Sequence, residues 1–209
     1  MIKVLIVDDV MILCQGLKAI LEQDAEFEIT GMAQNGKKAY EFCTKNTPDV
    51  VLMDMRMPEY DGAYGIRKIK SEFPQIKVLV LTTFDDEETI ETALSAGADG
   101  YILKEMEDEK IIFSIKSVYH GITVLGQSVF QSIKGNNRLD SPVSTQQFTQ
   151  RELTLIRLVA NGYSNKEIAA MLYLAEGTVK NGLSRVLEKL QLKDRTQLAI
   201  YALKNGLDN

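Results

Sequence analysis

A short apolar run, V-V-L-M at residues 50–53, constrains the fold more than any other stretch of this 209-residue chain. It follows Asp49 and leads into D-M-R-M-P, which begins at Asp54. An unbroken apolar run bounded by turn-forming residues is typical of a strand that is buried on both faces of a parallel sheet. Asp54 would then lie at the carboxyl end of the strand, where open α/β sheets place their ligand crevice. Taken alone, Asp54 is equally well explained as a residue that caps the loop before Pro58.

Similar apolar runs alternate with helical patterns through the first 120 residues or so. Strands are expected at residues 2–7, 27–33, 50–53, 76–82 and 100–103. Helices are expected after each strand, the first marked by apolar residues at helical spacing from Ile12 to Leu21 and the others over 37–45, 63–73, 87–96 and 108–119. Strand and helix alternate in units of about 20–25 residues, which predicts a five-stranded doubly wound parallel sheet.

The pattern changes after residue 122. We expect a short helix and a linker over 123–147, because much of this segment is rich in Gly, Asn, Ser and Pro without apolar periodicity. From 148 to 209 the periodicity is helical only and predicts an all-α domain of four helices. Two of these helices are expected to begin with capping boxes, Thr149 with Glu152 and Ser164 with Glu167. The chain is therefore divided into one domain at 1–122 and another at 148–209.

Charge is divided between the two halves of the chain. The net charge of -5 is the sum of -9 over residues 1–125 and +4 over residues 126–209. An acidic half joined to a basic half suggests one cationic partner and one polyanionic partner, such as nucleic acid. No apolar run approaches the length of a membrane span. Cys14 and Cys43 are isolated thiols, which is typical of a reducing compartment, so the sequence predicts a cytoplasmic protein without a membrane partner.

Polar side chains follow four of the five predicted strands. Asp8 and Asp9 follow the first strand, Asp54 the third, Thr82 ends the fourth and Lys104 follows the fifth. Because the carboxyl ends of parallel strands meet at one edge of the sheet, these side chains are expected to converge. Clustered carboxylates raise one another's pKa unless a cation is present, and Mg²⁺ suits oxygen ligands. A carboxylate, a hydroxyl and an ammonium in one pocket can accept and hold a phosphoryl group.

These residues, together with M-P-E-Y-D-G at 57–62, L-T-T-F at 81–84 and G-A-D-G-Y-I-L-K at 97–104, resemble the CheY-like receiver domain of bacterial two-component response regulators. The resemblance extends over residues 1–122. It implies that Asp54 is a phosphoacceptor and that a sensor histidine kinase is the partner. The further roles it implies are Mg²⁺ binding by Asp8, Asp9, Asp54 and the carbonyl of Arg56, phosphoryl binding by Thr82 and Lys104, and switching by Tyr101, which turns inward when Thr82 moves.

The second domain resembles the helix-turn-helix domain of LuxR/NarL-type regulators. The resemblance is carried by F-T-Q-R-E at 148–152, N-G-Y-S-N-K-E-I-A at 161–169 and G-T-V-K-N-G-L-S-R-V-L-E-K-L at 177–190. In this family the last helix, here about 195–204, pairs two such domains. The resemblance therefore implies a homodimer, when phosphorylated or DNA-bound, on double-stranded DNA with an inverted-repeat operator.

Polar and basic residues occupy the outer face of the predicted helix at 177–190, as in a helix that enters a major groove. By position, Lys180, Asn181 and Ser184 are candidates for contacts to base edges. The candidates for phosphate contacts are Lys166, Thr178 and Arg185. The alternative is a solvated helix face with no role in binding.

Two residues of the second domain depart from the pattern that the LuxR/NarL family leads us to expect. Ala175 stands where a capping Ser is common, which forfeits about 1 kcal/mol. Gly182 replaces a common His and costs the helix about another 0.8–1 kcal/mol relative to Ala. We therefore expect a recognition helix that frays when free. Arg56 lies beside the expected path of a hydrolytic water, so we hypothesise that it sets the lifetime of the phosphoryl group.

Together the two resemblances imply a DNA-binding response regulator and not an enzyme. Phosphorylation of Asp54 by a partner kinase would switch dimerisation and DNA binding to control transcription. One alternative is a constitutive DNA-binding regulator with a non-signalling receiver. Another is an HAD-like phosphatase, but that class needs a second Asp two residues after the nucleophile, where this chain has Arg56.

Overall fold

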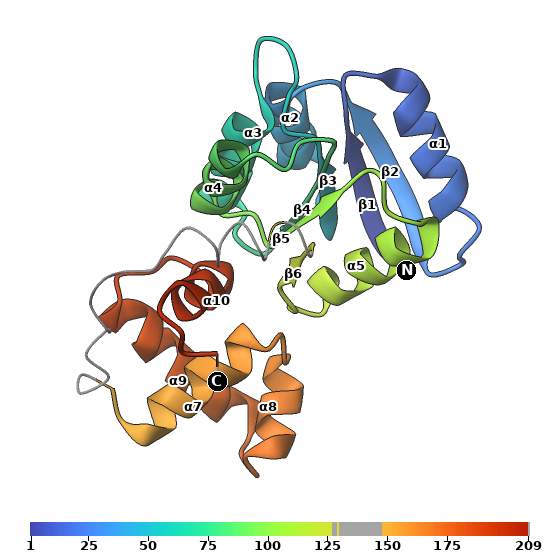
Figure 1. Ribbon diagram of the computed structural model, residues 1–209. Coiled ribbons are helices and arrows are strands. Elements are labelled where there is room, and N and C mark those ends of the chain that lie inside the picture. Colours follow the sequence, from blue (N-terminus) through green and yellow to red (C-terminus); the bar gives the residue numbers. More distant parts are fainter. Residues whose placement is uncertain (127–128, 130–147, 209) are drawn as a thin grey trace.

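Parallel strand pairing joins the first 125 residues of the chain into one sheet (Figure 1). The computed structural model describes residues 1–126, 129 and 148–208. The strands found in these residues are β1 (Ile2–Val7), β2 (Phe27–Ala33), β3 (Val50–Met53), β4 (Lys77–Thr82), β5 (Gly100–Leu103) and β6 (Val124–Leu125). Their order in the sheet is β2-β1-β3-β4-β5-β6, and every neighbouring pair is parallel.

The five predicted strands are all present, and the sheet of the described residues has one further strand, the two-residue β6, that was not predicted. The chain leaves α5 (Asp108–Tyr119) through Gly121, whose φ of +79° is easily adopted only by glycine. It then pairs Val124 and Leu125 with the free edge of β5. A two-residue strand is too short to show the side-chain periodicity from which strands are predicted. The sheet therefore continues past residue 122. Of the short helix and linker predicted over 123–147, only residues 123–126 and Val129 lie within the described residues.

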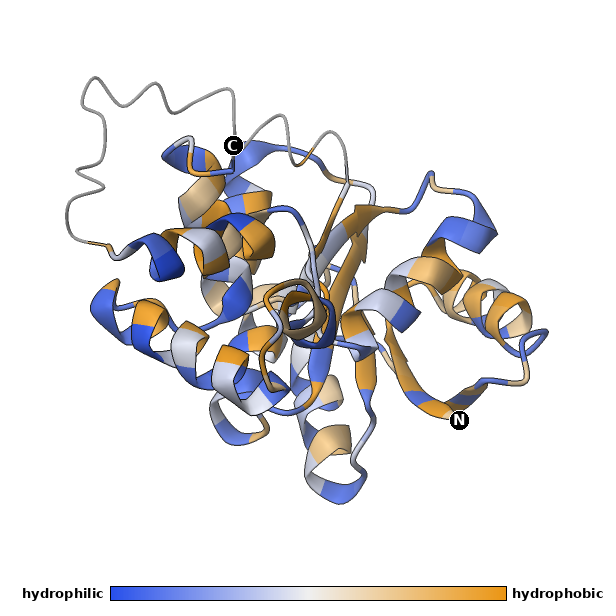
Figure 2. Ribbon diagram, turned by 90° about the horizontal axis from the view of Figure 1, so that it is seen from below, coloured by the Kyte–Doolittle hydropathy of each residue, from blue (hydrophilic) through white to orange (hydrophobic). Residues whose placement is uncertain are grey.

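Helices cover both faces of the sheet, as a doubly wound fold requires. On one face lie α1 (Met11–Leu21) and α5; on the other lie α2 (Gly36–Lys45), α3 (Gly62–Glu72) and α4 (Glu87–Ala96). Alternate residues of each strand supply the two cores, because successive side chains of a strand point to opposite faces. In Figure 2 the apolar strands accordingly lie between helices with polar outer turns.

The second domain is built from helices in its described residues, as predicted. They are α7 (Gln150–Ala160), α8 (Asn165–Met171), α9 (Glu176–Lys189) and α10 (Arg195–Lys204). Both predicted capping boxes are confirmed: the hydroxyls of Thr149 and Ser164 accept from the backbone N–H groups of Glu152 and Glu167. The four helices enclose one core centred on buried aliphatic residues such as Ile156, Ile168, Val179, Val186 and Leu198.

The last helix joins the two domains, because α10 packs against α4 (Figure 1). Leu203 of α10 is buried among the core residues that lie beneath α4. Lys204 Nζ lies 2.9 Å from Glu91 Oε1 of α4. At the other end of α10, the Thr196 hydroxyl donates to the carbonyl of Asp99 at 3.4 Å. The last helix of the second domain therefore forms a contact with the first domain.

Neither a disulfide nor a membrane span is formed by the described residues. Cys14 and Cys43 are buried free thiols, and burial raises the pKa of Cys43 to about 12. None of the helices described is long and apolar enough to cross a membrane.

Two glycines let α2 and α3 approach closely. A Cβ added at Gly36 would lie 2.3 Å from the carbonyl oxygen of Asp61 and 2.7 Å from the backbone nitrogen of Gly65. Both neighbours are backbone atoms and cannot rotate away. By contrast, a Cβ added at the exposed helical Gly16 of α1 would meet nothing within 4 Å.

We predict that Gly36→Ala lowers the free energy of unfolding by about 1–3 kcal/mol, because α2 must move away from α3 to admit the methyl group. The matched variant Gly16→Ala is expected to raise it by about 0.5–1 kcal/mol, since alanine is the better helix former. Urea unfolding of the full chain, followed by circular dichroism, measures both. Equal stability of the two variants would contradict the packing argument.

Candidate functional site

The sheet places two acidic side chains side by side. The pairing partner of Val7, the last residue of β1, is Met53, the last residue of β3. Asp8 and Asp54 come directly after these residues, and the Asp54 N–H donates to the Val7 carbonyl at 2.9 Å. In the sheet, β1 and β3 are neighbours, with β2 on the far side of β1 and β4 on the far side of β3. The chain therefore leaves β1 and β3 in opposite directions, which opens a crevice between their carboxyl ends.

An ammonium group lies between these two carboxylates. Lys104 Nζ is 2.6 Å from Asp8 Oδ2 and 3.1 Å from Asp54 Oδ1. Lys104 follows β5, and its backbone N–H donates to the Thr82 carbonyl at the end of β4. Both carboxylates are almost inaccessible to water, with exposed fractions of 2% for Asp8 and 5% for Asp54. The lysine therefore supplies the positive charge that two buried carboxylates need.

Burial dominates the acid–base behaviour of the pocket. It raises the pKa of Asp54, and the Lys104 ammonium offsets only part of this effect. Burial alone would lower the pKa of Lys104, but hydrogen bonding to Asp8 and the charge of Asp54 outweigh it, so the pKa of Lys104 is raised. Lys104 consequently keeps its proton and its positive charge. The ionised form of Asp54, by contrast, is destabilised because its carboxylate is poorly hydrated.

Thr82 ends β4, the strand next to β3, and Tyr101 lies in β5. The Thr82 hydroxyl is fully buried and makes no hydrogen bond of good geometry within the described residues, although it lies near enough to Asp54 to lower the pKa of that carboxyl. The Tyr101 ring is also fully buried, and its hydroxyl donates to the carbonyl of Phe84 at 2.7 Å. Tyr101 thus lies inward, the position that we expected it to take after a movement of Thr82.

Asp9 does not join the buried carboxylates. Its side chain is exposed, and no three His, Cys, Asp or Glu side chains of the described residues are gathered closely enough to hold a metal ion. The donors that are buried, Asp8 and Asp54, are oxygen ligands of the kind that Mg²⁺ prefers. The predicted site therefore fits Mg²⁺ in chemistry, but a complete ligand set would require the Asp9 side chain to turn inward.

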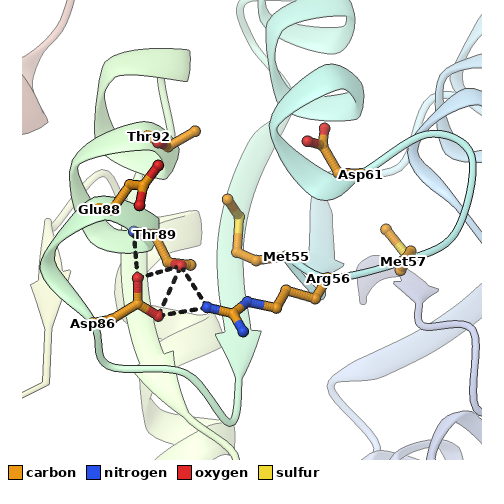
Figure 3. A pocket seen from close by; sticks show the side chains of 8 residues that line it. All are labelled: Met55, Arg56, Met57, Asp61, Asp86, Glu88, Thr89 and Thr92. Atoms are coloured by element: carbon orange, nitrogen blue, oxygen red, sulfur yellow. Dashed lines mark hydrogen bonds and ion pairs between the residues drawn. The ribbon is translucent and has the colours of Figure 1, made fainter.

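The Arg56 side chain extends toward α4 (Figure 3). Its backbone N–H donates to Asp54 Oδ2 at 3.2 Å, while its Nη2 lies 2.8 Å from Asp86 Oδ2. The guanidinium carbon lies 3.6 Å from the centroid of the Phe84 ring. Asp86 is also the N-cap of α4 and accepts from the Thr89 N–H. Arg56, Asp86 and Thr89 form part of the wall of a hollow of about 630 Å³, lined also by Met55, Met57, Asp61, Glu88 and Thr92.

Sequence reasoning did not identify Phe84, Asp86 or Thr89. The sequence D-E-E-T at 86–89 carries an N-cap signal for α4, an Asp three residues before a Thr. No spacing rule, however, links that cap to an arginine 30 residues earlier.

The six side chains predicted to contact DNA are all exposed; they are Lys166, Thr178, Lys180, Asn181, Ser184 and Arg185. Thr178, Asn181 and Arg185 line a hollow of about 370 Å³ between α9 and the start of α7. Lys180 and Ser184 follow one another along the next row of α9, where the Ser184 hydroxyl donates to the Lys180 carbonyl. The structure therefore brings five of the six onto one exposed side of α9.

Lys166 lies apart from the other five. It belongs to the first turn of α8 and lines a hollow of about 600 Å³ that includes His120, Gly121 and Ile122 of the first domain. In this arrangement the end of α5 faces the start of α8, so the first domain borders one of the predicted phosphate contacts.

Ala175 and Gly182 have different consequences for α9. The N-cap residue Ala175 makes no side-chain hydrogen bond, as predicted. Gly182, however, faces α7: a Cβ there would lie 2.8 Å from Leu155 Cδ1. A larger residue at 182 would have to displace Leu155, so glycine has a packing role that the sequence alone did not reveal.

Comparisons with known proteins cover nearly the whole chain. The family described as "Response regulator receiver domain" matches residues 4–116, and "Bacterial regulatory proteins, luxR family" matches residues 146–202. The transcriptional regulatory protein LnrK of Bacillus subtilis is 39% identical, with 99% of each chain covered. The response regulator protein VraR of Staphylococcus aureus is 37% identical, over 99% of this chain and 98% of its own.

A solved structure also matches both domains. The response regulator ChrA of a heme-sensing two-component system is 30% identical and covers 99% of this chain and 98% of its own, with a TM-score of 0.55.

We predict that Asp54→Asn stabilises the protein at neutral pH. Above its raised pKa, Asp54 must be ionised in a buried place, and the amide removes that cost, which is about 1.4 kcal/mol for each unit by which the pKa is raised. As pH falls, Asp54 is protonated in the folded wild type at a higher pH than in the unfolded chain. The advantage of the variant should therefore shrink as pH falls through the raised pKa toward the ordinary value of 3.8.

The measurement is urea unfolding at a series of pH values. The control is Asp85→Asn, which removes an exposed carboxylate of the β4–α4 segment. A variant that is less stable at pH 7, or whose advantage is independent of pH, would refute the interpretation.

Proposed function

The chain belongs to the DNA-binding response regulators that join a receiver domain to a LuxR-type helix-turn-helix domain, and on this premise we propose that phosphorylation of Asp54 controls its binding to DNA. The family regulates transcription, and the chain matches both of its domains, the receiver over residues 4–116 and the DNA-binding domain over 146–202. What the proposal adds is the residue that is phosphorylated, the ligands that serve it, and the surface through which the signal passes.

The observation that carries the proposal is the ion pairing of Lys104 with Asp8 and Asp54. A carboxylate oxygen of Asp54 attacks the phosphorus of a phosphohistidine, forming a P–O bond as the P–N bond breaks and the imidazole leaves. Lys104 and the unsatisfied Thr82 hydroxyl hold the oxygens of the transferred group. The single histidine of the chain, His120, ends α5, so the donor is a separate sensor histidine kinase.

Magnesium is part of the proposal. Asp8, Asp9, Asp54 and the carbonyl of Arg56 would hold Mg²⁺, which would neutralise the negative charge on the phosphoryl oxygens. Asp9 is the residue whose side chain has farthest to move, because Asp8 and Asp54 are already buried in the pocket.

The exposed side of α9 is the proposed DNA-reading surface. Lys180, Asn181 and Ser184 reach base edges, and Thr178 and Arg185 hold phosphates together with Lys166 of α8. Two copies would bind an inverted-repeat operator as a homodimer, because a two-fold symmetric dimer matches a palindromic site. Such a regulator acts in the cytoplasm, where both the kinase domain and the DNA are found.

The contact between α10 and α4 supports a route for control. One face of α10 packs in its own domain through Leu198 and Ala202, whereas Leu203 and Lys204 contact the receiver. In the dimer, α10 would instead face a second copy, and it cannot serve both partners with the same side chains. Phosphorylation would favour the state in which α10 is released from α4.

We predict that Asp54→Asn abolishes labelling by acetyl phosphate or a phosphorylated kinase and removes the effect of phosphodonor on DNA affinity. The reason is that an amide oxygen is too weak a nucleophile to accept the group. Gel separation of phosphorylated chains measures the first effect and fluorescence anisotropy with selected DNA the second. The control is Asp85→Asn, which retains both responses.

Persistence of the label in Asp54→Asn would overturn the assignment. Equal DNA affinity of the wild type with and without phosphodonor would instead favour the constitutive regulator with a non-signalling receiver.

We also predict that Glu91→Lys increases dimerisation and DNA affinity without phosphodonor by about two- to five-fold, the range expected for losing an exposed ion pair. The substitution replaces the 2.9 Å attraction to Lys204 by repulsion between α4 and α10. The double variant Glu91→Lys/Lys204→Glu restores the pair with opposite polarity and should return toward the wild-type value. Analytical ultracentrifugation measures the dimerisation. A double variant that behaves like the single one would show that this ion pair does not hold the chain in its unphosphorylated state.

A further inference from the structure

Arg56 connects the phosphoacceptor segment to the start of α4 through three contacts. Its Nη2 lies 2.8 Å from Asp86 Oδ2 and 3.4 Å from the Thr89 hydroxyl oxygen, and its guanidinium carbon lies 3.6 Å from the centroid of the Phe84 ring. Figure 3 shows the side chain extended across the hollow from the β3–α3 segment to Asp86 and Thr89 at the start of α4. One cation thus touches the β4–α4 segment at two places, the ring of Phe84 and the cap of α4.

The same β4–α4 segment is also held from the inside of the domain. The Phe84 carbonyl accepts the hydrogen bond from the buried Tyr101 hydroxyl. Thr82, with its unsatisfied hydroxyl beside Asp54, ends β4 two residues earlier. A movement of this segment therefore has to break the Arg56 contacts on the outside as well as the Tyr101 contact on the inside.

The Arg56–Asp86 pair is accessible to water and can be competed for. The side chains of Arg56 and Asp86 are 54% and 44% exposed, so their attraction is well screened. A phosphoryl group on Asp54 carries nearly two negative charges and three acceptor oxygens, a better partner for a guanidinium than one exposed carboxylate. The backbone of Arg56 already contacts Asp54 Oδ2 at 3.2 Å, so the competing group would form close to the point where the arginine side chain begins.

We propose that Arg56 is a positioning residue that exchanges Asp86 for the phosphoryl group on Asp54 and so couples phosphorylation to the position of α4. The exchange removes the ion pair from the α4 cap and the stacked cation from Phe84 in one movement. The β4–α4 segment is then free to follow Thr82 and Tyr101. Because α4 carries Glu91, the partner of Lys204, the displacement reaches the helix that joins the two domains. This inference rests on the proposed function, in which Asp54 is phosphorylated.

The test uses substitutions that separate charge from capping. Asp86→Asn keeps an N-cap residue of nearly equal capping strength but removes the charge that holds Arg56. Arg56→Gln removes the other half of the pair. Glu88→Gln is the matched control, since it deletes a negative charge from the same helical turn and lines the same hollow without contacting Arg56 through an ion pair or hydrogen bond. All variants are made in the full chain.

Two readouts distinguish the exchange from a merely structural role. Without phosphodonor, Asp86→Asn and Arg56→Gln should each raise DNA affinity about two- to five-fold. The double variant should give no further increase, because each substitution removes the same coupling. With phosphodonor, the half-life of the phosphorylated chain should change in opposite directions. Asp86→Asn frees Arg56 to cover the phosphoryl group and lengthens it, whereas Arg56→Gln shortens it.

Half-lives that change in the same direction, additive effects in the double variant, or an Asp86→Asn variant indistinguishable from Glu88→Gln would each overturn the inference. Failure of the proposed function looks different: the wild-type chain itself would then show no label on Asp54 or no response of DNA affinity to phosphodonor. If the wild type is labelled and responds, the outcome for the Asp86 and Arg56 variants judges the exchange alone.

Discussion

The pocket depends on one ammonium group placed between two buried carboxylates. Asp8 and Asp54 cannot both be ionised in so poorly hydrated a place without a cation beside them, and Lys104 is that cation. To bring the three together, β1, β3 and β5 must end at the same edge of the sheet. The pairing of one positive with two negative charges thus depends on the parallel order of the strands. An anion added at that edge changes the net charge that the loops enclose.

Much of the fold followed from the sequence because its signals are local. Apolar runs marked the five main strands, and the two capping boxes marked helix starts to within a residue. The convergence of Asp8, Asp54 and Lys104 followed from the rule that parallel strands share one carboxyl edge. The short β6 was missed because its pairing depends on backbone hydrogen bonds and leaves no side-chain pattern. The reach of Arg56 to Asp86, across 30 residues, was missed because side-chain direction is set by tertiary packing.

Helix α4 connects the pocket at the carboxyl edge of the sheet with the second domain. Its N-terminus is capped by Asp86, which pairs with Arg56 of the β3–α3 segment. Its outer surface carries Glu91 and contacts α10. The helix is short and packs on the sheet through small and aliphatic residues such as Ile90 and Ala93. A short, rigid element with contacts at both sites is well suited to transmit a small displacement, because packed helices shift as units.

The composition of the α4–α10 contact has a consequence for how such a regulator is tuned. Together with the neighbouring contacts of α10 on the first domain, it includes the buried Leu203, the partly buried Ile200, the Lys204–Glu91 ion pair and the hydrogen bond from the Thr196 hydroxyl to the Asp99 carbonyl. If phosphorylation of Asp54 controls DNA binding as proposed, the pocket sets the threshold, the amount of phosphodonor required for a response. The interdomain contact then sets the gain, the ratio of outputs in the two states. Different residues would set the two quantities, so surface substitutions on α10 would change the gain while the chemistry of the pocket stays constant.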